Sequence, residues 1–144
     1  MVSKNDLVEA LLTEMYFYQQ EFEKYIKEVS AIEHEMVGVK SPNLTGIHGT
    51  PEDRQHKLIR LGAKLKEMED IKESYEIKYK NIYQTLHLSQ LDDYDLRFLE
   101  YAYKKKYSGD DIAFELGYSD RKGVWRKRIH LLEKIGEMLW KGQY

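Results

Sequence analysis

The feature that most constrains this chain is the spacing of its apolar residues, which recur at intervals of three and four through most of the first 86 positions. This is the period of an α-helix with one buried face. The first such stretch comprises Leu11, Met15, Tyr18, Phe22, Ile26, Val29, Ile32 and Met36. The second comprises Leu58, Leu61, Leu65, Met68, Tyr75, Tyr79, Ile82 and Leu86. Both stretches predict long helices, and we expect an all-α chain.

Helix-start signals separate the two predicted helices. Ser3 with Asp6 is typical of a helix N-cap, and Thr50 followed by Pro51 marks a second start. Residues 38–50 hold three Gly and one Pro, which favours a loop. Two helices of similar length joined by such a loop predict a long antiparallel helical hairpin over residues 1–88.

This hairpin is too thin to bury a full hydrophobic core within one chain. Its seam is rich in Tyr and Met, and the whole chain has 12 Tyr against 4 Phe. We therefore expect the hairpin to pair with a second copy, most simply as a homodimer.

Residues 89–144 are predicted to form a separate three-helix domain. Helix starts are marked at Ser89 to Asp92 and again at Ser108. Gly117 occupies a turn that favours positive φ, and Ser119 is expected to cap the final helix. A short second helix, a turn and a basic third helix are typical of a helix-turn-helix.

The final predicted helix carries a dense run of basic residues, although the chain as a whole has a net charge of -2. The only acid between positions 119 and 130 is Asp120. Because an α-helix fits the major groove, Arg121 and Arg126 are candidates for reading guanine edges. The phosphate-holding candidates are Lys122, Lys127 and Arg128.

Three further residues complete the candidate DNA-binding set: Ser119, Lys105 and Trp125. Lys105 belongs to the run from Lys104 to Lys106, which is a candidate for a second contact with the DNA backbone. Trp125 is expected either to pack against the first helix of the domain or to lie against the sugar-phosphate edge.

The segment YSGDDIAFELGYSDRKGVWRKRIHLLEKI resembles region four of bacterial sigma factors. The whole layout, with SPNLTG in the linker and ELGYS in the turn, resembles the ArpU-type regulators of phages of Gram-positive bacteria. The resemblance implies a sigma-like helix-turn-helix and control of phage late genes through promoter DNA.

One position departs from the usual motif. The β-branched core residue expected ten positions after Ala113 is Gly123 here, and Val124 follows. Two registers of the recognition helix, about 100° apart, therefore stay open.

Other chemistry finds little support in the sequence. The chain has no Cys, and the five His, at positions 34, 48, 56, 87 and 130, do not share a helix face at ligand spacing. The acids at 92, 93, 95, 110 and 111 are expected to cap helices. With no P-loop, dinucleotide fingerprint or nucleophile elbow, neither an enzyme nor a cofactor or metal is expected. Residues 1–30 lack an apolar run long enough for a signal peptide or membrane span, which predicts a cytoplasmic protein.

We therefore expect a sequence-specific transcriptional regulator of phage type that binds double-stranded DNA as a homodimer. Its recognition helix, near residues 119–140, is expected to dock in the major groove, and host RNA polymerase is a further candidate partner. Two alternatives stay open: a DNA-packaging component similar to a small terminase subunit, and a protein-protein adaptor whose basic helix binds an acidic partner.

Overall fold

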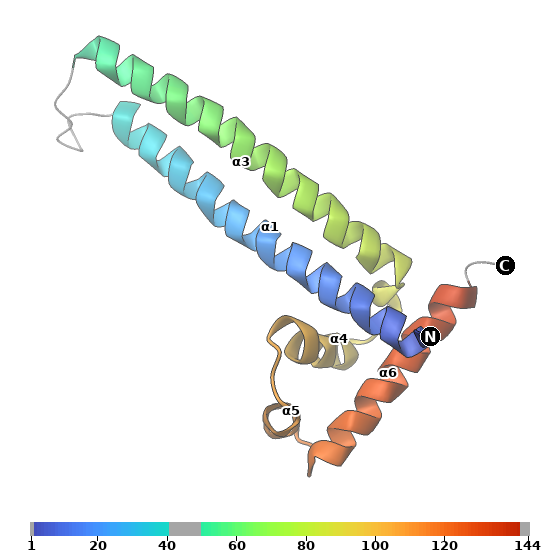
Figure 1. Cartoon of the computed structure of the whole chain (residues 1–144). Coiled ribbons are helices and arrows are strands. Elements are labelled where there is room, and N and C mark those ends of the chain that lie inside the picture. Colours follow the sequence, from blue (N-terminus) through green and yellow to red (C-terminus); the bar gives the residue numbers. More distant parts are fainter. Residues whose placement is uncertain (1, 41–49, 142–144) are drawn as a thin grey trace. The chain divides into compact units, whose positions relative to one another are not determined.

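The computed structural model describes residues 2–40 and 50–141, and every regular element within these ranges is a helix (Figure 1). The elements, in order, are α1 (Lys4–Lys40), α3 (Pro51–Thr85), η1 (Leu88–Gln90), α4 (Asp93–Leu99), η2 (Glu100–Lys104), α5 (Gly109–Leu116) and α6 (Arg121–Lys141). The all-α prediction is confirmed. Most of the predicted loop, including His48 and the SPNLTG motif, lies outside the described residues. Within these ranges, no helix combines the length and apolarity needed to cross a bilayer.

Side-chain caps fix where the helices begin. The Ser3 hydroxyl accepts a hydrogen bond from the Asp6 N–H at 3.1 Å, and the Asp6 carboxylate accepts one from the Ser3 N–H at 3.3 Å. Thr50 and Asp53 repeat this reciprocal pair at the start of α3. Each pair satisfies N–H groups that the first turn leaves without helical partners. The predicted starts at Ser3 and Thr50 are confirmed.

The predicted cap of the final helix was wrong by one residue. Helix α6 begins at Arg121, and the Asp120 carboxylate, not the Ser119 hydroxyl, accepts the hydrogen bond from the Gly123 N–H at 3.1 Å. A side-chain cap serves the N–H two or three residues after it, and Asp120 stands three residues before Gly123.

The chain divides into two compact units. One, here called the cluster unit, comprises Met1–Gln20 and Ile77–Tyr144, and the other, the two-helix unit, comprises Glu21–Glu76. Each long helix therefore contributes one part to each unit.

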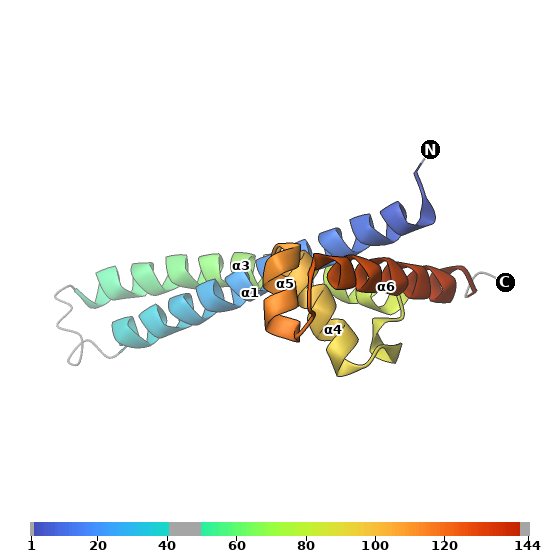
Figure 2. The ribbon, with the colours of Figure 1, turned by 90° about the horizontal axis from the view of Figure 1, so that it is seen from below.

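In the two-helix unit, the segments of α1 and α3 lie side by side (Figures 1 and 2). Tyr25 stacks on Tyr75 with ring centroids 5.8 Å apart, and farther along Lys57 Nζ lies 3.6 Å from Glu35 Oε1. Since residue numbers rise on one helix as they fall on the other, the segments run antiparallel. Among the described residues of this unit, its hydrophobic cluster has three buried members, Ile32, Val39 and Leu61, with four partly buried neighbours.

The cluster unit has a larger core, in which α4, α5 and α6 gather against one another (Figure 2). Val8, Leu12, Met15 and Tyr16 of α1 are buried in the same core as residues from Leu86 onward. The α1 contribution thus comes from a stripe that only partly coincides with the predicted one. The buried members contributed by the other elements are Leu86, Leu88, Leu91, Phe98, Leu99, Tyr103, Ile112, Ala113, Val124, Leu131, Leu132 and Ile135.

A wide helical turn ends the first helix of this C-terminal region. The helix predicted from Ser89 is interrupted at its start, where η1 precedes α4, and it continues as the π-helical η2 to Lys104. The Lys105 N–H donates to the Glu100 carbonyl at 2.9 Å, five residues back. This widening adds a residue to the turn, and it brings Tyr101 and Tyr107 into a stacked contact at 5.1 Å.

Candidate nucleic-acid interface

The connection from α5 to α6 depends on a glycine. Gly117 has φ of +82°, as predicted for this turn, a conformation that costs residues with a Cβ more than it costs glycine. The N–H groups of Gly117 and Tyr118 both donate to the Ala113 carbonyl, at 3.0 and 2.9 Å. These bonds close the end of α5 and let the chain turn directly into α6.

The orientation of α6 follows from the residues at its start. Val124 is 2% exposed and belongs to the core, whereas Gly123 faces the Tyr118 ring so closely that an added Cβ would lie 3.2 Å from Tyr118 Cδ1. The structure therefore adopts the register with Val124 inward. Tyr118 also packs edge-on against Phe98, with ring centroids 6.3 Å apart. Burial, reinforced by a hydrogen bond with Tyr94, raises the pKa of the Tyr118 hydroxyl.

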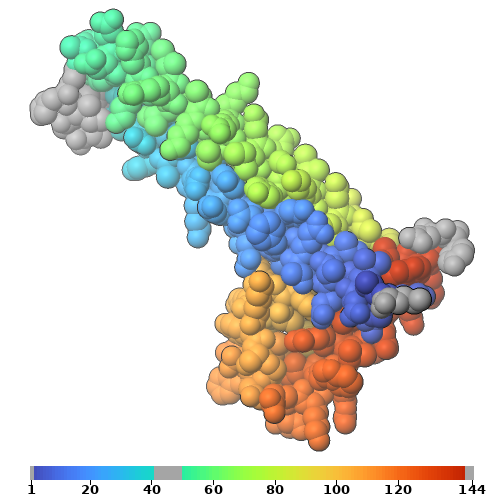
Figure 3. Space-filling view, viewed as in Figure 1, coloured from blue at the N-terminus to red at the C-terminus, as the bar shows by residue number. Residues whose placement is uncertain are grey.

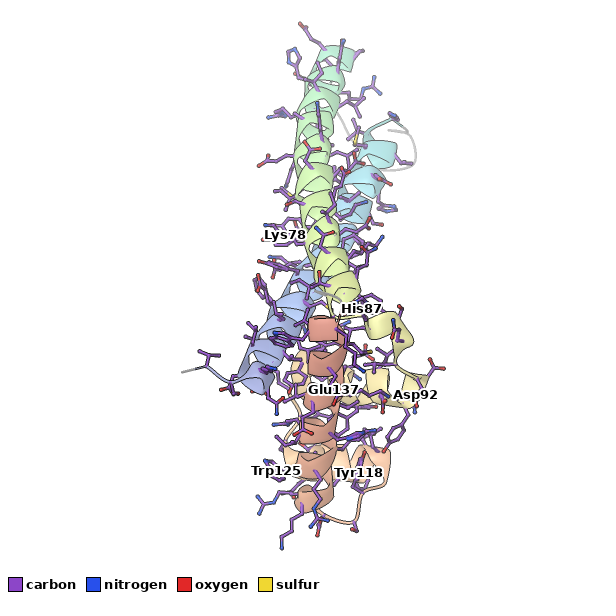
Figure 4. The ribbon with its side chains drawn as sticks, turned by 90° about the vertical axis from the view of Figure 1, so that its right-hand side faces the viewer. Lys78, His87, Asp92, Tyr118, Trp125 and Glu137 are labelled. Atoms are coloured by element: carbon purple, nitrogen blue, oxygen red, sulfur yellow. The ribbon has the colours of Figure 1, made fainter. Side chains whose placement is uncertain are left out.

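This register leaves a basic surface on the first turns of α6. Arg121, Lys122 and Arg126 are exposed, and Trp125 is 63% exposed between them. Figure 4 shows Trp125 and Tyr118 on opposite sides of these turns. The high exposure of Trp125 excludes the expectation that it packs into the first helix of the domain. We call Arg121, Lys122, Trp125 and Arg126 the basic face.

The acids near this face do little to neutralise its cations. The Asp120 carboxylate caps α6. Arg121 Nε lies 3.4 Å from Asp110 Oδ1, but both side chains are about three-quarters exposed, at 75% and 74%. Exposed pairs of this kind contribute little energy and are readily exchanged. The guanidinium of Arg121 therefore stays accessible to an anionic partner.

Lys127 has a different environment from the basic face. Its Nζ lies 2.6 Å from Asp95 Oδ1, and Lys134 Nζ lies 3.6 Å from Asp95 Oδ2. Asp95 is 4% exposed, the only buried charged residue in the part of the chain that the structure describes. Lys127 and Lys134 thus tie α6 to α4. The sequence analysis predicted that Asp95 contributes to helix capping. Its backbone N–H does take part in the cap, donating to the Asp92 carboxylate at 2.8 Å. The ion pairs of the Asp95 carboxylate were not predicted.

Arg128 also turns toward the unit's interior. Its guanidinium lies 5.9 Å from the centroid of the Tyr103 ring, and the side chain is half-buried. The Tyr103 hydroxyl donates to Glu9 Oε2 at 2.6 Å. Burial, with this hydrogen bond as the second cause, raises the pKa of Tyr103. The contacts link α1, η2 and α6, so Arg128 is a packing residue as well as a cation.

The two remaining candidates lie outside α6. Ser119 is exposed in the turn just before α6, next to the basic face in sequence. Lys105 is exposed after η2, where its Nζ lies 4.7 Å from the Tyr101 ring centroid and 5.9 Å from that of Tyr107. The structure therefore groups four of the eight predicted residues on one face and places Lys105 on another segment.

Helix α5 presents a surface that the sequence reasoning missed. Phe114 is 86% exposed, and the exposed acids Asp110, Asp111 and Glu115 share its side of the helix. The signal was available, because Ile112 and Ala113 define the buried side and leave position 114 outward. This surface is anionic and aromatic, unlike the basic face of α6.

Among the described residues, no three His, Asp or Glu side chains are grouped closely enough to bind a metal ion. No family model, curated protein or solved structure matches the chain. The functional interpretation therefore depends on the geometry of α5, the turn and α6.

Proposed function

We propose that the cluster unit is a helix-turn-helix domain of the sigma region-four type and that α6 docks its first turns in the major groove of double-stranded DNA. The basic face is the observation that carries this proposal. Three exposed cations and an exposed Trp occupy the helix end that enters the groove in such domains. Asp120, the acid that precedes these residues in the sequence, is engaged in capping.

The residue types fit the chemistry of DNA. Arg121 and Arg126 offer planar guanidinium groups that can donate two hydrogen bonds to one guanine. Lys122 supplies a mobile charge for a phosphate. Trp125 adds apolar contact with a sugar edge or a thymine methyl group. A sequence-specific regulator of transcription, of the phage type that the sequence resembles, is the function that these groups support best.

Lys127 and Arg128 have a supporting role in this proposal. Their contacts with Asp95 and with the Tyr103 ring hold α6 against the rest of the unit. A rigid helix loses less conformational entropy on docking, so residues that stay out of the groove still favour binding.

Replacing Lys122 and Arg126 together with Ala is expected to weaken duplex binding by about 2 kcal/mol, roughly thirtyfold, through lost phosphate and base contacts. Both side chains are exposed, so the fold should be retained. Fluorescence polarisation with labelled duplexes, selected from a random pool by the unmodified protein, measures the change. The salt dependence of binding should also become shallower.

The matched control removes two cations elsewhere. Arg60 and Lys66 are exposed on α3 in the two-helix unit, and their joint replacement with Ala leaves the same net charge. The control should bind selected duplexes as the unmodified protein does. Equal loss in both variants would mean that only overall charge matters, and no loss in either would refute the docking of α6.

We also propose that α1 and α3 form an antiparallel hairpin through which two copies associate into a dimer. The support is the thin core of the two-helix unit together with its exposed apolar side chains, Ile26, Val37 and Ile59, which are 41%, 60% and 62% exposed. A dimer would present two copies of α6 to a two-part DNA site.

Sedimentation velocity at tens of micromolar tests this assembly. The unmodified chain should sediment as a dimer, and Val37→Glu combined with Ile59→Glu should sediment as a folded monomer. A monomeric unmodified chain would refute the dimer. A large ring would favour the packaging alternative instead.

A further inference from the structure

A groove in the cluster unit lies apart from the basic face, between the N-terminal part of α1 and the segment around η2. Figure 3 shows the surfaces of these two segments next to one another. The groove has a volume of about 590 Å³. Its lining consists of Asp6, Glu9, Ala10, Thr13, Glu14, Phe17 and Gln20 from α1, with Tyr103 and Lys106 opposite.

The seven α1 positions form one continuous stripe. They follow one another at intervals of one or three residues, and Asp6 and Gln20 are 14 positions apart, which corresponds to about 21 Å of helix. The opposite stripe of α1, with Val8 and Leu12, is buried in the core. The groove therefore presents four turns of a rigid helix to a partner, a length that suits another helix better than a small molecule.

The stripe combines apolar and acidic groups. Phe17 is 52% exposed, and Ala10 precedes it by two turns. Asp6, Glu9 and Glu14 supply three carboxylates against the single cation of Lys106. This charge repels phosphates, which favours a cationic partner over nucleic acid as the occupant.

The walls of the groove are held in place by hydrogen bonds. Tyr103 donates to Glu9 at 2.6 Å, and Gln20 Nε2 donates to the Lys104 carbonyl at 3.0 Å. These two bonds join α1 to η2 near the two ends of the groove. A partner would thus meet a preformed surface, which lowers the entropic cost of binding.

We infer that this groove docks a basic amphipathic helix of a partner protein, with apolar side chains against Ala10 and Phe17 and Lys or Arg beside the three carboxylates. Charge complementarity and the four-turn length together select this occupant. The inference goes beyond DNA binding, because a chain that holds DNA through α6 and a second protein through α1 would connect the two.

The test uses no DNA, so its result is independent of the proposed function. The probes are labelled 16-residue peptides of Leu, Lys and Ala, with Leu at the i, i+3, i+4 and i+7 spacing, and two, four or six Lys. Binding to the full chain is followed by fluorescence polarisation. Affinity should rise with the number of Lys, and peptides with Glu in place of Lys, or with the Leu positions scrambled, should bind at least tenfold more weakly.

Variants locate the binding site. Glu14→Lys with Phe17→Ser, both exposed positions, should weaken peptide binding at least tenfold. The matched control, Glu115→Lys with Phe114→Ser, removes an exposed acid and an exposed aromatic residue from α5 and should have no effect. Absence of binding by every Lys peptide, or equal losses in both variants, would overturn the inference. So would sedimentation showing that the α1 variant dissociates an assembly of the chain itself, because the occupant would then be a second copy.

Discussion

Replacing Leu12 with Ala is expected to destabilise the cluster unit by about 3 kcal/mol, because Leu12 is completely buried among residues of the C-terminal region. The change leaves a cavity where α1 meets that core. Both Trp residues of the chain, Trp125 and Trp140, lie in the cluster unit. Urea unfolding followed by Trp fluorescence therefore reports the stability of this unit.

Leu7→Ala is the matched control, on the same helix and with the same atoms removed. Leu7 is 42% exposed, so the free energy of unfolding should fall by no more than about 0.5 kcal/mol. Equal, small effects of the two changes would show that the N-terminal part of α1 does not belong to this core. A truncated chain lacking residues before Glu21 would then be expected to fold its C-terminal region unaided.

The second large effect is expected at Asp95. Asp95→Ala should lower the free energy of unfolding by about 3 kcal/mol, since it removes a buried carboxylate that pairs with two lysines. Lys127 is only 23% exposed and would be left partly desolvated without its counter-charge. The same urea experiment measures the loss.

Asp93→Ala provides the comparison, because Asp93 occupies the same first turn of α4 but is exposed. The Asp93 carboxylate stabilises the fold only through its interaction with the helix dipole, so its loss should cost about 0.3–1 kcal/mol. If both changes cost the same, the Asp95 carboxylate acts only as a helix-end charge, as the sequence alone suggested. A larger loss for Asp95 would establish the link between α4 and α6 as a main support of the basic face.

Local features of this chain were readable from the sequence. The helical period of its apolar residues, the reciprocal caps at Ser3 and Thr50, and the positive φ of Gly117 each involve residues within a few positions of one another. Helical geometry alone brings such residues together, so their spacing is sufficient. The same holds for the basic run, whose members all lie between positions 121 and 128.

Long-range choices were decided by the tertiary structure. The stripe of α1 that faces the core near Val8 and Leu12 coincides only partly with the predicted one, since α1 packs there against residues from 86 onward and not along a single regular seam. The basic run was likewise divided by its surroundings. Asp95 and Tyr103, which are 32 and 25 positions away from Lys127 and Arg128, draw those two cations inward and leave Lys122, Trp125 and Arg126 outward. Spacing along the chain determines which residues share a helix face, but the partner that covers a face comes from a distant segment, and only its packing decides which charges stay in water.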